Sequence, residues 1–134
     1  MRILVGVDVQ PIDEVAASIR EFGERYTKRL FTDHELESCG ENPVTAVSGL
    51  AGRFAAKEAV LKVLDLAEAV PAWRDIEVRR SPSGRPQIVL SGDAREIARR
   101  QGVRDLSVSL SHGGGIATAT VVAQLADEEE GATT

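Results

Sequence analysis

Hydrophobic and polar positions follow two different periods along this chain, and the period changes near its middle. Residues 2–9 are rich in Ile, Leu and Val and predict a buried strand that ends at Asp8. After Pro11, apolar residues at helical spacing predict a helix that Gly23 stops. Three further helical segments are expected in the first half: one at 25–30, one that begins at Asp33 behind a Thr32-x-x-Glu35 capping box, and a long one over 44–66.

The second half is richer in strands, and residues 75–79 and 106–110 alternate with a period of two, which is typical of strands. The expected strands cover 75–79, 87–90, 106–110 and 116–125. The turn Ser81-Pro82-Ser83-Gly84-Arg85-Pro86 joins the first two as a hairpin, and 93–101 predicts a helix that Gly102 stops. The whole pattern predicts an α+β fold with an antiparallel sheet and one long helix.

Length and composition indicate a single domain at residues 1–125, because a chain of 134 residues is close to the commonest domain size. Residues 126–134 are mostly acidic, small or polar and predict a disordered tail. The apolar runs are too short to span a bilayer and the first residues do not resemble a signal peptide, so we expect a cytoplasmic protein. The net charge of −5 argues against nucleic acid as the main ligand.

Polar groups stand in three segments where a hydrophobic core does not require them. Asp8 ends a strand of buried type, and Glu58 lies in a helical run of small and apolar residues. A buried carboxylate costs free energy unless it is paired, hydrogen-bonded or bound to a cation. Two such carboxylates suit Mg²⁺, which completes its coordination with water and substrate phosphate. The third segment, Ser109-Leu110-Ser111-His112, precedes three glycines that would let a ligand approach the backbone closely.

Several cationic side chains are candidates for binding a phosphate group: Arg53, Lys57, Lys62, Arg85 and His112. On a helix, Glu58 and Lys62 share one face, whereas Lys57 points about 100° away. Each feature also has an ordinary alternative. Glu58 and Lys62 have the spacing of a solvated surface pair, Arg53 and Lys57 that of a wet helix face, and Asp8 can be a turn residue.

Taken together, these segments resemble the holo-acyl-carrier-protein synthases, the small 4′-phosphopantetheinyl transferases. The resemblance extends to about Ala123, and its most specific part is Ala51-Gly52-Arg53-Phe54-Ala55-Ala56-Lys57-Glu58-Ala59-x-x-Lys62. The other matching pieces are Gly6-Val7-Asp8-Val9, Arg29-Leu30-Phe31-Thr32-x-x-Glu35, Asp75-Ile76-Glu77-Val78, Gly84-Arg85-Pro86 and Ser109-Leu110-Ser111-His112. The resemblance implies the fold of that family and a homotrimer with active sites between neighbouring subunits.

The resemblance also implies a reaction and a set of roles. A serine hydroxyl of an apo acyl carrier protein attacks the β-phosphate of coenzyme A, takes the 4′-phosphopantetheine group and releases adenosine 3′,5′-bisphosphate, a step of fatty acid biosynthesis. Asp8 and Glu58 would hold Mg²⁺. Lys62 would contact the phosphates, and either Glu58 or a water on the metal would be the base. The further coenzyme A contacts that the resemblance implies are Arg53, Lys57, Gly84, Arg85, Pro86, Ser109, Ser111 and His112.

The chain departs from the family near the expected docking site of the carrier. Family members often have a basic residue near the start of the first helix, whereas this chain has Asp13 and Glu14. Like charges would weaken docking of an acidic carrier, so we expect a docking surface shifted toward the later basic residues, Arg20, Arg25, Lys28 and Arg29, or a carrier from a polyketide or peptide pathway.

Two other functions remain open from the sequence. One is a non-catalytic homologue of the same fold that binds coenzyme A or a carrier protein. The other is an unrelated small α+β scaffold, which predicts that Asp8, Glu58 and Lys62 lie far apart.

Overall fold

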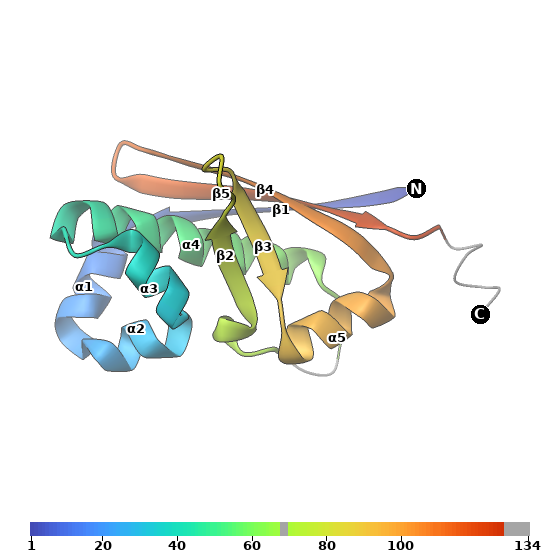
Figure 1. Cartoon of the computed structure of the whole chain (residues 1–134), viewed down its shortest axis with the longest axis horizontal. Coiled ribbons are helices and arrows are strands. Elements are labelled where there is room, and N and C mark those ends of the chain that lie inside the picture. The colour runs from blue at the N-terminus through green and yellow to red at the C-terminus, as the bar shows by residue number, and fades with distance from the viewer. Residues whose placement is uncertain (68–69, 128–134) are drawn as a thin grey trace.

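The computed structural model describes residues 1–67 and 70–127, which form two antiparallel sheets and six helical segments (Figure 1). The larger sheet has three strands in the order β1-β5-β4, with β1 at Arg2–Pro11, β4 at Val103–Gly113 and β5 at Ile116–Leu125. The smaller sheet pairs β2 (Ile76–Arg80) with β3 (Pro86–Leu90). The α+β fold with antiparallel strands is therefore confirmed.

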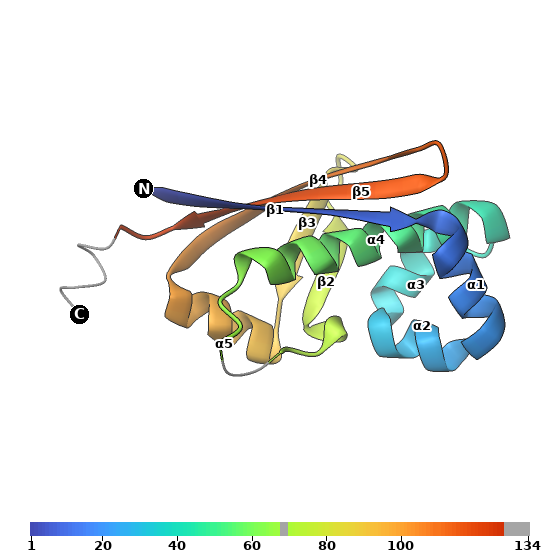
Figure 2. The same ribbon diagram turned by 180° about the vertical axis from the view of Figure 1, so that it is seen from behind.

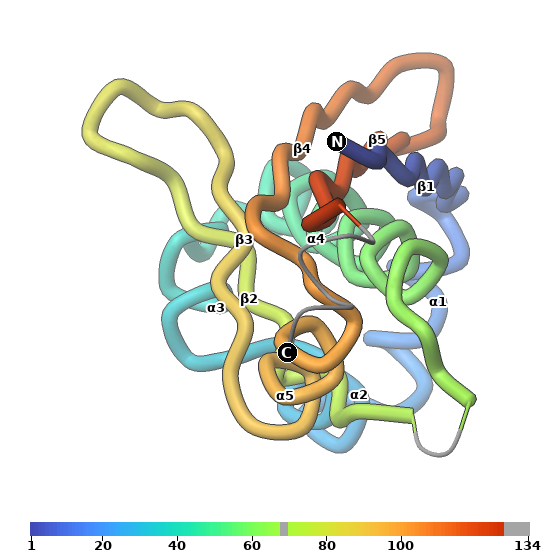
Figure 3. Tube along the Cα trace, turned by 90° about the vertical axis from the view of Figure 1, so that its right-hand side faces the viewer, coloured from blue at the N-terminus to red at the C-terminus, as the bar shows by residue number. Residues whose placement is uncertain are grey.

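One long helix lies along the larger sheet, and the other α-helices lie near its two ends. The helices are α1 (Ile12–Phe22), α2 (Glu24–Leu30), α3 (Asp33–Cys39), α4 (Pro43–Val63), the 3₁₀ helix η1 (Trp73–Asp75) and α5 (Gly92–Gln101). Figure 2 shows α4 along one face of the sheet, with α1, α2 and α3 gathered at its N-terminal end and α5 at the other end. In Figure 3, which looks along the molecule, the turn between β2 and β3 projects away from the body.

The helix boundaries follow from capping groups in the sequence. Thr32 begins α3 with the expected capping box, because its hydroxyl accepts the Glu35 N–H at 3.2 Å while its own N–H donates to Glu35 Oε1 at 3.0 Å. Asn42 caps α4 by accepting the Val44 N–H at 3.0 Å, and Pro43 occupies the first helical position. Helix α4 ends at Val63 rather than at 66, because Leu64 already has an extended backbone.

Two hydrophobic clusters lie on opposite parts of α4. The C-terminal half of α4 packs against β2, α5 and β5, with Val60, Ile76 and Val121 fully buried. Its N-terminal half packs against α1 and the segment after α2 through Leu50 and Phe31. A single helix therefore contributes to both clusters.

Strand β1 is buried on one face only, which corrects the expectation of a buried strand. Four of its apolar side chains are about half exposed: Ile3, Val5, Val7 and Val9. They point away from α4, whereas Gly6 is buried on the α4 side. Composition alone could not reveal this, because an apolar residue on an uncovered sheet face looks the same in sequence as one in a core.

The first two residues of the predicted tail lie within the described structure. Ala126 donates its N–H to Gly102 at 2.8 Å, so the first expected tail residue is held by the fold. Residues 128–134 of the predicted tail lie outside the described residues. Within the described ranges, no helix is long and apolar enough to cross a membrane.

Candidate active site

The close approach of β1 to α4 brings Asp8 to the helix. A Cβ added at Gly6 would lie 2.2 Å from the carbonyl oxygen of Ala59, so no other residue fits at this crossing without moving the strand. Asp8 follows two residues later on the same face of β1. Glu58 and Lys62 lie on either side of Ala59 in the sequence of α4. Because Gly6 has no side chain, β1 approaches α4 closely enough to bring Asp8 near them.

Asp8 is held by two donors. Lys62 Nζ lies 3.3 Å from Asp8 Oδ1 and donates to the Val7 carbonyl at 2.6 Å. Gln10 Nε2 donates to Asp8 Oδ2 at 2.7 Å. The Asp8 side chain is 14% exposed, whereas that of Lys62 is 51% exposed. Lys62 therefore reaches from solvent across to β1, and the scaffold in which these groups lie far apart is excluded.

Glu58 completes the group through electrostatics. Burial raises the pKa of the Glu58 carboxyl, the negative charge of Asp8 raises it further, and Lys62 lowers it. Within the described part of the chain no ion pair joins Glu58 to Lys62, because Lys62 pairs with Asp8 instead. The ordinary surface pair that the spacing allowed is not what the structure contains.

The chemistry of these carboxylates fits a hard divalent cation. The negative charge of Asp8 raises the proton affinity of Glu58, and a cation bound between the two carboxylates would relieve that repulsion. Among residues 1–67 and 70–127, no three His, Cys, Asp or Glu side chains gather as a metal site. Asp8 and Glu58 could thus supply only part of a coordination shell, which suits Mg²⁺ with water and a substrate phosphate as the other ligands.

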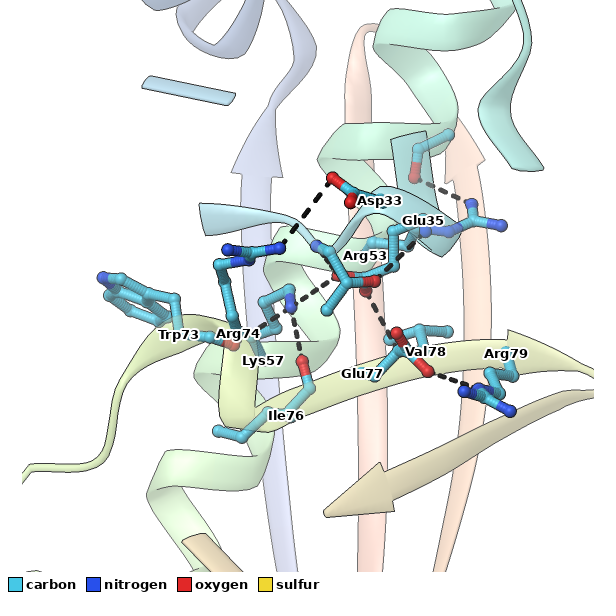
Figure 4. Close-up of polar contacts among 12 residues, drawn as sticks. Asp33, Glu35, Arg53, Lys57, Trp73, Arg74, Ile76, Glu77, Val78 and Arg79 are labelled. Carbon is cyan, nitrogen blue, oxygen red and sulfur yellow. Dashed lines mark hydrogen bonds and ion pairs between the residues drawn. The ribbon is translucent and has the colours of Figure 1, made fainter. Parts of the chain in front are cut away.

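Lys57 has a structural place, and the prediction that it contacts coenzyme A is wrong. Its side chain is fully buried, and Nζ donates to Glu35 Oε1 at 2.8 Å, to the Trp73 carbonyl at 3.1 Å and to the Ile76 carbonyl (Figure 4). An ammonium has three donors, and all three are used. Burial lowers the pKa of Lys57, and the Glu35 carboxylate opposes that shift. The alternative of a wet helix face is also wrong.

Glu35 is the other half of this buried pair and was missed as a key residue. It is 0% exposed, and its Oε2 accepts the Val78 N–H at 3.0 Å while Oε1 accepts from Thr32 and Lys57. The pair thus ties α3, α4 and β2 together. The signal in the sequence was the capping box, which explains one bond of Glu35 but not its burial.

Arg53 lines a cationic cavity on the β4 side of α4. Its residue is 4% exposed, and Nη1 donates to the Gly49 carbonyl at 3.2 Å. Among the described residues, Arg53 Nε has no hydrogen-bond partner. The cavity, about 570 Å³ in volume, is also lined by Arg80, Ser111 and His112. A guanidinium with an unused buried donor beside other cationic groups indicates an anion site.

A second groove of about 660 Å³ lies between β3 and β4 and is lined by Arg80, Arg85, Pro86 and Ser109. Arg80 Nη1 donates to the Gly84 carbonyl at 2.7 Å and so holds the turn in which Gly84 has a φ of +87°. Arg80 lines both cavities, although nothing in the sequence distinguishes it from the neighbouring Arg79.

The predicted site residues fall into two groups, one around Asp8 and one around Ser109 and Ser111, that lie apart within one chain. Asp8 lies on the α4 side of the sheet, at the β1 edge. By strand register, Ser109 and Ser111 lie on the opposite face, in the same rows as Val7 and Val9, at the β4 edge. Strand β5 separates the two edges.

Comparison with known proteins agrees with this fold. Residues 4–121 match the model of the 4′-phosphopantetheinyl transferase superfamily, and the chain belongs to that family. Within it, the chain is an enzyme of the holo-[acyl-carrier-protein] synthase type. The enzyme of that name from Dehalococcoides mccartyi is 40% identical over 122 residues, which are 91% of this chain and 98% of that protein.

Solved structures of the same type superpose well. A complex described as Chronobacterium ammoniagenes ACPS-CoA has a TM-score of 0.83 and 27% identity, covering 95% of this chain and 100% of that one. The Helicobacter pylori synthase in complex with coenzyme A has a TM-score of 0.76 and 29% identity, covering 90% and 100%.

Proposed function

We propose that this enzyme uses Mg²⁺ to transfer the 4′-phosphopantetheine group of coenzyme A to a serine of an apo acyl carrier protein in the cytoplasm. The observation that carries the proposal is the convergence of Asp8, Glu58 and Lys62 where β1 crosses α4. The coenzyme A complexes of two relatives that share this fold support the choice of donor.

The reaction is a displacement at phosphorus. The serine oxygen forms a bond to the β-phosphorus, and the bond from that phosphorus to the oxygen of adenosine 3′,5′-bisphosphate breaks. Asp8 and Glu58 would hold Mg²⁺, which when bound neutralises charge on the pyrophosphate. Lys62 is exposed enough to leave Asp8 and contact the transferred phosphate.

Glu58 is suited to accept the proton of the serine hydroxyl, directly or through water. Lys62 pairs with Asp8 and leaves the Glu58 carboxylate available to accept a proton. Arg53 and His112, in the cavity of about 570 Å³, would bind a phosphate of coenzyme A, and Arg85, Pro86 and Ser109 would contact the nucleotide in the neighbouring groove.

The proposal includes a homotrimer with shared active sites. Two features support it: the exposed apolar row of β1, and the separation of the Asp8 group from the Ser109 and Ser111 edge within one chain. A complementation experiment tests it. Mixing Glu58→Gln and Arg85→Ala chains should restore part of the activity if one subunit supplies the carboxylates and its neighbour the hairpin. Mixtures no more active than the separate variants would contradict shared sites.

The carrier is proposed to dock on α2 rather than at the start of α1. Arg25 and Arg29 line a cavity of about 590 Å³ together with Phe22, Tyr26 and Trp73, whereas the first turn of α1 carries Asp13 and Glu14. Arg substitutions at Asp13 and Glu14 should raise the rate on an acidic fatty-acid carrier. An unchanged rate would contradict the proposed repulsion between the start of α1 and an acidic carrier, and would favour another carrier class.

Mass spectrometry tests the function as a whole. An apo carrier incubated with coenzyme A, Mg²⁺ and this enzyme should gain one phosphopantetheine, and Glu58→Ala should abolish the gain. Glu96→Ala, an exposed glutamate of α5, is the matched control and should remain active. No gain with the wild-type chain, over a panel of carriers, would favour a non-catalytic binding protein.

A further inference from the structure

Gln10 contacts one oxygen of Asp8 and leaves the other for a cation. Strand alternation places residues 8 and 10 on the same face of β1, and Gln10 Nε2 donates to Asp8 Oδ2 at 2.7 Å. Lys62 Nζ lies against the other oxygen, Oδ1, at 3.3 Å. The two oxygens of one carboxylate therefore have different partners, a neutral amide and a positive charge.

This division limits how the carboxylate can turn. A carboxylate with two free oxygens can rotate about its terminal bond at little cost, so its preferred direction toward a ligand is poorly defined. With Oδ2 held by an amide, rotation must break a hydrogen bond in a site that is only 14% exposed. Oδ1, the oxygen that already faces a cation, stays directed toward α4.

The side chain at position 10 suits this task in length and charge. An amide donor compensates Oδ2 without adding a positive charge that would repel a metal ion. A glutamate would add a third negative charge and lose the donor. Methionine has nearly the same length and shape but no donor, so it separates the hydrogen bond from the packing of the side chain.

We infer that Gln10 is a positioning residue that orients Asp8 for binding a divalent cation. This inference rests on the proposed function, because it assigns to Gln10 the support of the proposed metal ligand. Groups that orient a metal ligand typically contribute about 10- to 100-fold to metal affinity. Gln10→Met should therefore weaken binding of the metal by about that factor and raise the Mg²⁺ concentration needed for half-maximal activity more than it lowers kcat.

The test is calorimetric titration with Mn²⁺, in the presence of coenzyme A, of the wild-type enzyme, Gln10→Met and Gln101→Met. Gln101 is the matched control, since it also makes side-chain hydrogen bonds, to Val63 and Asp65 at the end of α4, but lies away from Asp8. We expect a dissociation constant about 10- to 100-fold higher for Gln10→Met only. Gln101→Met should lower the thermal unfolding midpoint and keep the wild-type Mn²⁺ affinity.

The outcomes distinguish failure of the proposed role of Gln10 from failure of the proposed metal site. Equal Mn²⁺ affinity in wild type and Gln10→Met would overturn the role of Gln10 while leaving the metal site intact. Equal weakening by Gln101→Met would also overturn it, because the effect would then come from general destabilisation. If the wild-type enzyme bound no Mn²⁺ at all, the proposed metal site itself would be contradicted.

Discussion

Helix α4 carries two lysines that each meet a carboxylate, and the two pairs differ in every physical respect. Lys57 is fully buried with Glu35, and each of its donors has an acceptor. Lys62 is half exposed, shares Asp8 with Gln10, and leaves Glu58 nearby with a raised pKa. The comparison teaches that a saturated charge pair holds a fold together, whereas an exposed cation among incompletely compensated carboxylates can exchange its partner for a ligand.

The largest expected effect is on catalysis in the group formed by Asp8, Glu58 and Lys62. Glu58→Gln removes the proposed base and metal ligand and should slow transfer by about 10²- to 10⁴-fold, the usual contribution of a positioned acid or base. The measurement is the initial rate of carrier modification at saturating coenzyme A. A variant that keeps more than a tenth of the wild-type rate would remove Glu58 from the mechanism.

The next effect is on stability at the buried pair of Lys57 and Glu35. Lys57→Met leaves Glu35 buried and charged without its cation, and should lower the free energy of unfolding by about 3–5 kcal/mol in urea titrations. The control is Lys28→Met, which breaks an exposed pair with Glu24 and should change it by about 0–1 kcal/mol.

A double variant sharpens that test. Combining Lys57→Met with Glu35→Gln removes the unpaired charge, so it should be more stable than Lys57→Met alone. If the double variant is the less stable of the two, unpaired charge is not the cause of the loss.

A further substitution acts on the close crossing of β1 and α4. Gly6→Ala would place a methyl group against the Ala59 carbonyl and push β1 away from α4. We expect a loss of about 1–3 kcal/mol in the free energy of unfolding, together with a lower transfer rate in the folded protein because Asp8 moves. Gly113→Ala, where nothing lies within 4 Å of the added group, is the control. Equal effects at both glycines would contradict the close crossing.

The smallest effect is a pH dependence of stability. The pKa of Glu58 is raised in the folded state, so the folded protein binds this proton more tightly than the unfolded chain. Ionised Glu58 therefore destabilises the fold above its raised pKa, and this cost disappears as the pH falls below the pKa of the unfolded chain. Thermal unfolding should show Glu58→Gln to be slightly more stable than wild type at pH 8, with the advantage shrinking in acid. A pH-independent difference would contradict the raised pKa.

Local signals in the sequence predicted most of the fold. The Thr32 capping box, the Gly102 stop and the last strand at 116–125, which is rich in Val, Ala and Thr, all appear where expected, because each depends on neighbours within a few residues. The uncovered face of β1 could not be predicted, since it depends on which face of the sheet α4 covers (Figure 2).

The candidate site was predicted only in part, because its local features can be recognised in the sequence whereas its long-range contacts cannot. Glu58 and Lys62 share a helix face by spacing alone, and Asp8 was a candidate because it ends a strand of buried type. The burial of Lys57 depends on Glu35, which is 22 residues away in sequence, and on backbone carbonyls near η1. Nothing in the local pattern distinguishes such a lysine from one that binds a phosphate.

The contrast between the two lysines is tested most directly by the transfer rate per folded molecule of Lys62→Met and Lys57→Met, with the folded fraction taken from circular dichroism at low temperature. Lys62→Met should be fully folded and slower by about 10²- to 10³-fold, the cost of removing one donor to the reacting phosphate. Lys57→Met should be poorly folded, with the folded fraction retaining a rate close to wild type. A folded Lys62→Met enzyme at the wild-type rate would contradict the division of roles along α4.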